Sequence, residues 1–150
     1  MNLVLCIGTA GALFFLDAFW KRRVTALHEA GALPRLFARG RVRIGYVKNS
    51  GLMMGKAKSH PGLVLFLPSL TVVLLAFLAV RLVPDAGAPA ALGFGLLLGG
   101  GLNNLWDRFR QRFVTDYLNF PRIKKIRNLY FNLSDFGIFL GALFVCLSLL

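Results

Sequence analysis

Four long apolar blocks constrain the fold more than any other feature of the chain. They cover residues 1–20, 62–83, 88–106 and 130–150, and 57% of all residues are hydrophobic. Crossing the hydrocarbon of a bilayer takes about 20 apolar residues, whereas a soluble core is built from shorter, periodic runs. The blocks therefore predict a mainly α-helical membrane protein with four transmembrane helices. Residues 1–150 then form a single domain.

The first block resembles a secretory signal peptide in length and hydropathy. However, it has no basic start, and no small-residue cleavage site precedes the basic residues Lys21, Arg22 and Arg23. We therefore expect residues 1–20 to stay in the protein as its first span.

The polar stretch of residues 21–61 predicts two surface elements. Residues 22–39 mix apolar and basic side chains, which is typical of a short amphipathic helix lying on the membrane surface, broken at Pro34. Residues 41–47 alternate polar and apolar side chains, which predicts a strand, and a turn follows at residues 49–51. We expect a small extramembrane β-cradle there.

The third block is rich in small residues. Gly95 and Gly99 form a GxxxG pair, and Gly100 and Gly101 follow it. Such residues let helix backbones approach closely in lipid, where packing replaces the hydrophobic effect. They predict tight helix contacts and need no chemical role.

Polar residues near the span ends have two interpretations. On a helix, Asn104, Asp107 and Arg108 share one face. They form either a wet interfacial cap, with Trp106 in the aromatic belt, or part of a functional site, because ionisable groups in a span are costly and usually functional. The spacing alone does not decide between them.

Two aspartates raise the same question. Asn132 and Asp135 also share a face, about a turn and a half inside the fourth block, either as a structural contact between helices or as functional groups. Asp116 follows the β-rich patch 113–115 at the membrane edge. If the two aspartates converged, they would not both ionise cheaply. One would then take a proton from water while the other polarised a carbonyl, which hydrolyses an amide.

Five short motifs occur in the order that one known family shows. They are Asp17-Ala-Phe-Trp-Lys21, Asn49-Ser-Gly-Leu-Met-Met-Gly55, Gly99-Gly-Gly-Leu-Asn-Asn-Leu-Trp-Asp-Arg108, Phe113-Val-Thr-Asp-Tyr117 and Phe131-Asn-Leu-Ser-Asp135. On a four-span frame of the right length, they resemble the lipoprotein signal peptidases (type II signal peptidases). The last two match Val-Val-Asp-Phe and Phe-Asn-x-Ala-Asp in that family. Met54 stands for its phenylalanine, Asn103 for a glycine and Ser134 for the alanine.

The resemblance implies an intramembrane aspartyl endopeptidase that needs neither a cofactor nor a metal ion. It implies that Asp116 and Asp135 are catalytic. It also implies cleavage just before the diacylglyceryl-modified cysteine of a prolipoprotein. Matches to the family's substrate-binding and supporting positions are Asn49, Gly51, Asn104, Asp107, Arg108, Asn132, Asp17 and Lys21.

The resemblance places the protein in the bacterial cytoplasmic (inner) membrane as a multi-pass monomer, with its active site near the outer face. The net charge of +12 then reflects contact with anionic lipid headgroups, and no nucleic acid is expected. Of the 18 basic residues, ten lie in residues 21–58 and seven in residues 108–127. The positive-inside rule would put both loops in the cytoplasm, which conflicts with this orientation.

Two other classes of function remain as alternatives. One is a divergent, non-catalytic relative that binds lipidated chains or scaffolds membrane helices. The other is a small transporter, although the chain shows no paired inverted halves. Metal-dependent hydrolysis is disfavoured because His28 and His60 are isolated in loops, and no serine or cysteine has the neighbours of a nucleophile.

Overall fold

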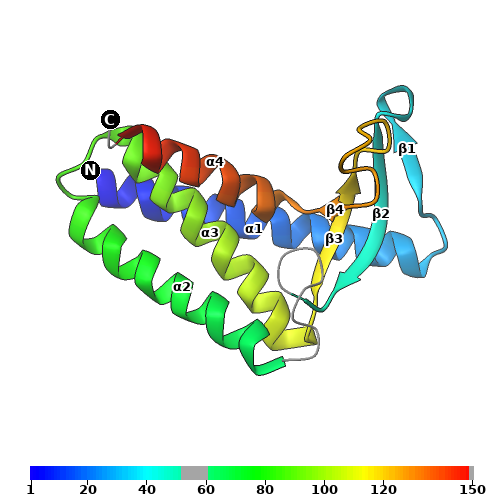
Figure 1. Cartoon of the computed structure of the whole chain (residues 1–150), viewed down its shortest axis with the longest axis horizontal. Helices are drawn as coiled ribbons and strands as arrows, with labels where there is room; N and C mark the ends of the chain where they lie inside the picture. Colours follow the sequence, from blue (N-terminus) through cyan, green and yellow to red (C-terminus); the bar gives the residue numbers. More distant parts are fainter. Residues whose placement is uncertain (52–60, 149–150) are drawn as a thin grey trace.

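The computed structural model describes residues 1–51 and 61–148 of the chain. Figure 1 shows helices lying side by side, with a small sheet at one end and both termini at the other. The elements in order are α1 (Asn2–Glu29), β1 (Arg35–Phe37), the 3-10 turn η1 (Ala38–Gly40), β2 (Val42–Asn49), α2 (Pro61–Leu82), α3 (Ala88–Gln111), β3 (Val114–Asn119), β4 (Tyr130–Phe131) and α4 (Leu133–Ser148). The mainly helical fold with a small sheet agrees with the sequence-based prediction.

The helix α1 is longer than its apolar block. It continues through the basic residues that follow residue 20 and ends before Gly31, whose φ of +66° terminates it. The helix continues because Lys21 points inward, where it is buried against acids instead of marking a wet helix end. The prediction of a separate amphipathic surface helix over residues 22–39 is therefore wrong.

The rest of that segment belongs to the sheet. β1 pairs with β2, and the four strands lie in the order β1-β2-β3-β4, all antiparallel. The strand predicted over residues 41–47 is confirmed as β2. An irregularity between Ile44 and Val47 shifts the register, after which Val47 lies opposite Asp116. The sheet thus holds the first candidate aspartate next to the end of α1.

The helix α3 is central in the helical layer, with α1 and α4 packed against it more extensively than α2. Its glycines make this possible. A Cβ on Gly95 would lie 2.6 Å from the backbone oxygen of Cys6 in α1, and a Cβ on Gly100 would lie 2.7 Å from that of Ser134 in α4. The close packing predicted from these small residues is confirmed.

The fourth apolar block begins as a strand and not as a helix. β4 takes Tyr130 and Phe131, and α4 starts at Leu133. Asp135 therefore lies in the first turn of α4, and not a turn and a half inside it. At the other boundary, α3 continues to Gln111, beyond the end that hydropathy predicts at residue 106. The first error arises because β4 and the start of α4 are both apolar, and the second because polar residues at the end of α3 face the protein interior.

Two helices are long and apolar enough to cross a bilayer, Asn2–Glu29 and Gly62–Leu82, and Leu133–Ser148 is a shorter apolar helix. Large apolar side chains of α1 and α2 are exposed on the outside of the helical layer. The outermost side chains of α2 are between 60% and 64% exposed, namely Phe66, Val73, Phe77 and Val80. An apolar exterior of this kind is what lipid contact requires.

Candidate active site

Asp116 lies on β3, most of whose residues are buried. Its Oδ1 accepts a hydrogen bond from Asn132 Nδ2 at 2.7 Å, and its Oδ2 accepts one from Asn49 Nδ2 at 3.0 Å. Burial, followed by the negative charge of Asp135, raises the pKa of the Asp116 carboxyl to about 7, although both amide hydrogen bonds act in the opposite direction. Near neutral pH this carboxyl is therefore divided between its protonated and ionised forms.

Asp135 is the third residue of α4, and Asn132 precedes that helix. The backbone N–H of Asp135 donates to Asn132 Oδ1 at 3.0 Å, and the backbone N–H of Asn132 donates to Asp135 Oδ2 at 3.1 Å. This reciprocal pair is a capping box. Oδ1 of Asp135 accepts from Asn104 Nδ2 of α3 at 3.1 Å. The spacing of Asn132 and Asp135 is thus explained by a helix start that also contacts a second helix.

The side chain of Asn132 joins the two aspartates. Its NH2 group donates to the Asp116 carboxyl, and its oxygen accepts from the backbone of Asp135. Asn132 is fully buried, so water does not compete for these bonds. The structure therefore brings Asp116 and Asp135 into one polar cluster.

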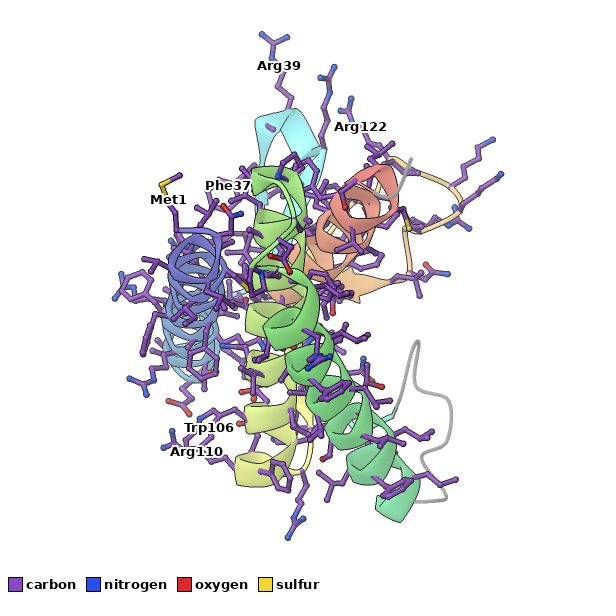
Figure 2. All side chains as sticks on the ribbon, turned by 90° about the vertical axis from the view of Figure 1, so that its left-hand side faces the viewer. Met1, Phe37, Arg39, Trp106, Arg110 and Arg122 are labelled. Atoms are coloured by element: carbon purple, nitrogen blue, oxygen red, sulfur yellow. The ribbon has the colours of Figure 1, made fainter. Side chains whose placement is uncertain are left out.

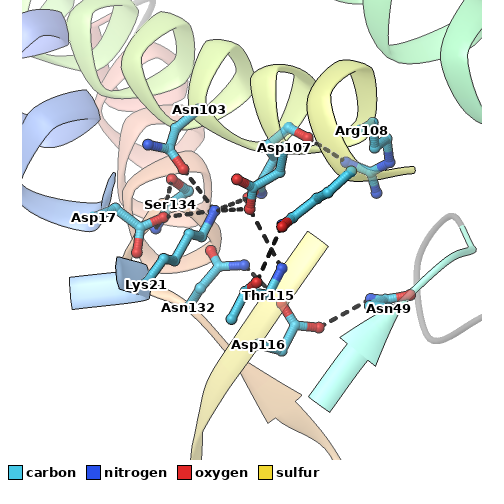
Figure 3. Close-up of polar contacts among 12 residues, drawn as sticks. Asp17, Lys21, Asn49, Asn103, Asp107, Arg108, Thr115, Asp116, Asn132 and Ser134 are labelled. Carbon is cyan, nitrogen blue, oxygen red and sulfur yellow. Dashed lines mark hydrogen bonds and ion pairs between the residues drawn. The ribbon is translucent and has the colours of Figure 1, made fainter. Parts of the chain in front are cut away.

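A buried ion network lies beside the aspartates (Figure 3). Lys21 Nζ is 3.1 Å from Asp17 Oδ2 and 3.0 Å from Asp107 Oδ2. It also donates to Asn103 Oδ1 at 2.5 Å and to Asn104 Oδ1 at 2.9 Å. A buried ammonium group is tolerated only with such partners. Because Asn104 also binds the aspartate of α4, the network connects α1 to the candidate catalytic pair.

Besides pairing with Lys21, Asp17 accepts hydrogen bonds at the start of α4. It accepts hydrogen bonds from the backbone N–H groups of Leu133 at 3.2 Å and Ser134 at 3.3 Å. Two hydroxyls also donate to it, from Ser134 at 2.5 Å and from Tyr117 at 2.8 Å. Asp17 thus caps α4 from outside that helix.

Arg108 is only 8% exposed, so the interpretation of this residue as part of a wet interfacial cap is wrong. Its Nη1 donates to the backbone oxygen of Asn104 at 3.1 Å, and its Nη2 donates to that of Gly51 at 3.2 Å. Its Nε has no partner within the part of the chain that the structure describes. Trp106 is 54% exposed, as an aromatic-belt residue would be.

The turn predicted after β2 forms as an Asx turn, in which the N–H of Gly51 donates to Asn49 Oδ1 at 3.2 Å. Asn49 therefore links this turn to Asp116. The remainder of the predicted cradle loop of residues 41–58, including Met54 and Gly55, lies outside the described residues.

Sequence reasoning did not assign roles to four residues of the cluster, and one of them is Ser134, which donates its hydroxyl to Asp17. Thr115 donates its backbone N–H to Asp107 at 3.3 Å, and Tyr117 and Asn103 contact Asp17 and Lys21 respectively. Tyr117 and Thr115 are ordinary strand residues in a sequence, so nothing marked them. Asn103 did carry a signal, because it is a polar residue inside an apolar block.

The arrangement suits acid–base chemistry on a carbonyl compound. Two buried carboxyls that interact electrostatically hold one proton between them more easily than none. The ionised member then accepts a proton from an attacking water, and the protonated member donates to the carbonyl oxygen. Hydrolysis of an amide needs both steps.

Comparison with protein families gives a match over nearly the whole chain, since the family model for Signal peptidase (SPase) II covers residues 9–150. A lipoprotein signal peptidase of Syntrophus aciditrophicus is 30% identical over an alignment that covers 99% of this chain and 93% of that protein. One from Wigglesworthia glossinidia brevipalpis is 27% identical over 88% of this chain and 85% of its own length. One from Oleidesulfovibrio alaskensis is 39% identical, and the match spans about half its length, 53%.

Solved structures share the fold. Two bacterial membrane enzymes determined by the in meso method superpose with TM-scores of 0.73 and 0.72. The first is 16% identical and is matched over 95% of this chain and 88% of its own. The second is 18% identical and is matched over 96% of this chain and 94% of its own. At these identities the likeness concerns the fold alone.

Proposed function

The chain belongs to the signal peptidase II family, and on that premise we propose that Asp116 and Asp135 are its catalytic pair. The function is removal of signal peptides from prolipoproteins by an aspartic peptidase. The observation that supports the pair is the position of Asn132, which binds the carboxyl of Asp116 and the backbone of Asp135 at once. The non-catalytic alternative is not favoured, because the family is one of peptidases.

In this mechanism the two aspartates share one proton near neutral pH. The ionised carboxyl takes a proton from water, and the resulting hydroxide adds to the carbonyl carbon of the scissile amide. The protonated carboxyl gives its proton to the carbonyl oxygen, which forms a neutral tetrahedral diol. Collapse of the diol breaks the C–N bond, and the first carboxyl returns its proton to the leaving nitrogen. As the C=O bond re-forms, one diol hydroxyl gives its proton back to the second carboxylate. The pair thus regains its starting protonation.

The surrounding residues divide into two groups in this proposal. Asn49, Asn104 and Asn132 donate amide hydrogen bonds that orient the carboxyls. Arg108, whose Nε has no partner among the described residues, helps to bind substrate. The ion network of Asp17, Lys21 and Asp107 supports both. Gly51 contributes its backbone oxygen to Arg108.

The protein is a membrane protein, and we propose that all four helices cross the bilayer. α3 has 24 residues, enough for ~36 Å of helix, and it packs between α1 and α4. α4 has only 16 residues and spans ~24 Å, less than the ~30 Å hydrocarbon thickness. Its far end lies level with the other terminus (Figure 1). Asp135 in its first turn would then lie at lipid depth, where a substrate with a diacylglyceryl-modified cysteine is held.

The proposed orientation places the sheet and the aspartates near the outer face, with both termini in the cytoplasm. Arg39 and Arg122 project from the sheet end (Figure 2), and Arg122 Nη2 donates to the backbone oxygen of Arg39 at 2.7 Å. The two basic loops that violate the positive-inside rule thus meet at Arg39 and Arg122. We propose that these loops contact anionic lipid headgroups. We also propose that the protein acts as a monomer, because one chain supplies every residue of the site.

The activity is tested by cleavage of a diacylglyceryl-modified prolipoprotein by the purified protein in detergent. Asp116→Asn and Asp135→Asn should each abolish cleavage while the protein stays folded. Asp85→Asn is the matched control, because Asp85 is exposed in the α2–α3 connector at the opposite end of the helices. Cleavage by either site variant at more than about 1% of the wild-type rate would exclude that residue as catalytic.

The orientation is tested separately. In a chain with both native cysteines replaced, Arg39→Cys and Asp85→Cys place one thiol at each end of the helices. A membrane-impermeant maleimide added to intact spheroplasts should label the first variant and not the second. The opposite pattern would leave the peptidase assignment in place and show that the site faces the cytoplasm.

A further inference from the structure

We propose that Asp17 is a cross-tie that sets the spacing of the catalytic pair, and that Tyr117 and Ser134 are positioning residues acting through it. The inference rests on the proposed catalytic role of Asp116 and Asp135. It adds two residues to the machinery and gives each a distinct, measurable contribution.

The geometry of the cross-tie follows from chain neighbours. Tyr117 comes directly after Asp116 on β3, and Ser134 comes directly before Asp135 on α4. Both donate hydroxyl hydrogen bonds to Asp17, Tyr117 to Oδ1 at 2.8 Å and Ser134 to Oδ2 at 2.5 Å. One carboxylate on a third element, α1, therefore holds the residue next to each catalytic aspartate.

Burial makes this link rigid. Asp17, Tyr117 and Ser134 are all buried, so water does not replace a lost bond. A buried carboxylate is tolerated when donors surround it, and hydrogen bonds to a charged group are stronger than neutral ones. The tie is therefore short and charge-assisted on both sides.

The two sides of the tie differ in redundancy. Asp17 reaches α4 through the hydroxyl of Ser134 and through the backbone N–H groups of Leu133 and Ser134. It reaches β3 only through the hydroxyl of Tyr117, among the described residues. Loss of the Tyr117 hydroxyl should cut the tie, whereas loss of the Ser134 hydroxyl should only loosen it.

This chain departs from the family's motifs at the residues that touch the tie. Tyr117 stands where Val-Val-Asp-Phe has phenylalanine, and Ser134 stands where Phe-Asn-x-Ala-Asp has alanine. Asn103, which stands for a glycine, donates to the backbone oxygen of Phe14 at 2.8 Å and accepts from Lys21. All three departures therefore add polar contacts to the Asp17–Lys21 pair. Together they form one polar unit around Asp17 and Lys21.

The charged groups around the catalytic pair limit what a pH profile reports. Asp17 and Lys21 face it from α1, and Asp107 and Arg108 face it from α3. The neighbouring groups from β2 and the start of α4 are the neutral amides of Asn49 and Asn132. Replacing the hydroxyls of Tyr117 or Ser134 changes none of these charges. A shift in the profile would therefore report a changed separation of the two catalytic carboxyls.

The test compares Tyr117→Phe, Ser134→Ala and the double variant in prolipoprotein cleavage, with kcat, KM and the pH profile measured for each. Tyr117→Phe should lower kcat about tenfold and Ser134→Ala about threefold, because small misplacements of catalytic groups are costly. KM should stay within about twofold. The double variant should have the same kcat as Tyr117→Phe, because loss of the Tyr117 hydroxyl already breaks the link through Asp17. The alkaline limb of the kcat–pH profile should move to lower pH, because the carboxyls of Asp116 and Asp135 repel each other less when they lie further apart.

Matched controls remove equivalent hydroxyls elsewhere. Tyr130→Phe removes a tyrosine hydroxyl on β4, and Ser69→Ala removes a serine hydroxyl that donates to Leu65 of its own helix at 2.8 Å. Both should keep the wild-type kcat and pH profile. Ser134→Thr retains the hydroxyl and should restore the wild-type rate and profile.

Several outcomes would overturn the cross-tie. The first is an unchanged kcat and pH profile in Tyr117→Phe. The second is a double variant whose loss of kcat is the product of the two single losses. The third is a Tyr117→Phe protein that loses thermal stability but keeps the wild-type pH profile. If Asp116→Asn or Asp135→Asn still cleaves, the proposed function itself fails. If both are inactive while Tyr117→Phe behaves as wild type, only the cross-tie fails.

Discussion

The two halves of α3 are held in the protein by opposite means. The half that starts at Ala88 meets its neighbours through glycines, with Gly95 against α1 and Gly100 against α4. The half that ends at Gln111 meets them through buried polar side chains, with Asn103 and Asn104 on Lys21 of α1. In lipid, close backbone packing needs no polar group. The polar half therefore does more than hold helices together, and the proposed catalytic pair lies beside it.

The difference also separates stability from chemistry. At the glycine end, an added methyl group is the main threat, because backbone oxygens lie within van der Waals contact. At the polar end, a lost partner is the main threat, because the remaining charge stays buried. Substitutions at the two ends should therefore fail for different reasons and by different amounts.

The largest effect on stability should come from Lys21→Met. It removes the only cation bonded to Asp17 and Asp107 among the described residues, and breaking a buried pair costs about 3–5 kcal/mol. Denaturant or thermal unfolding in detergent measures it. Arg22→Met, one residue further along α1 and exposed, should change stability by less than ~0.5 kcal/mol. Equal stabilities of the two variants would show that the ion network does not fasten the polar half.

The next effect is a pH dependence of the free energy of unfolding. The native pKa of Asp116 is raised from 3.8 to about 7, so between these values the folded protein holds a proton that the unfolded chain releases. Stability should therefore fall as pH rises from about 4 to about 7, by up to ~4 kcal/mol, and level off above. Asp116→Asn should flatten this part of the curve. A wild-type curve that is already flat there would contradict the raised pKa.

A smaller effect is expected at the glycine contacts. A Cβ on Gly100 would lie 2.7 Å from the Ser134 backbone oxygen, so Gly100→Ala should push α4 away and cost ~1–3 kcal/mol. It should also reduce cleavage, because Ser134 is next to Asp135. Gly8→Ala on α1, which meets nothing within 4 Å, is the control and should be neutral. A fully active, stable Gly100→Ala protein would mean that α4 shifts without moving the site.

The smallest effect should appear on the outward face of α2. Phe77 is 62% exposed, whereas Phe94 of α3 is 4% exposed. Phe77→Leu should change stability by less than ~0.5 kcal/mol, and Phe94→Leu should cost about 1 kcal/mol by leaving a packing defect. Similar losses at both positions would mean that Phe77 has a protein partner instead of lipid.

Hydropathy and alternation predicted most elements of the fold. The apolar blocks gave the helices, the alternating residues 41–47 gave β2, and the glycines gave the close contacts of α3. The errors have two causes. Hydropathy ends a span at a charged residue, so it stopped the first helix at Lys21 and did not foresee that an acid from α3 would pair with it. Hydropathy also could not separate β4 from α4, because both segments are apolar.

The candidate site was predicted in part. The pairing of Asp116 with Asp135 came from the resemblance to a family, since their spacing left the question open. Asn132 and Asp135 were expected on one face, and the capping box explains why. The contacts of Tyr117 and Ser134 with Asp17 had no signal in spacing, because the three residues come from three different elements.

The sequence by itself determined that this chain is a helical membrane protein with small residues at its helix contacts, because transfer of apolar surface and close packing depend on residue type and order. Only the tertiary structure decided where the buried charges go. A lysine, an arginine, four aspartates and four asparagines are costly in an apolar interior unless each meets a partner. Those partners lie on other elements, and only the folded arrangement of α1, α3, α4 and the sheet brings them together.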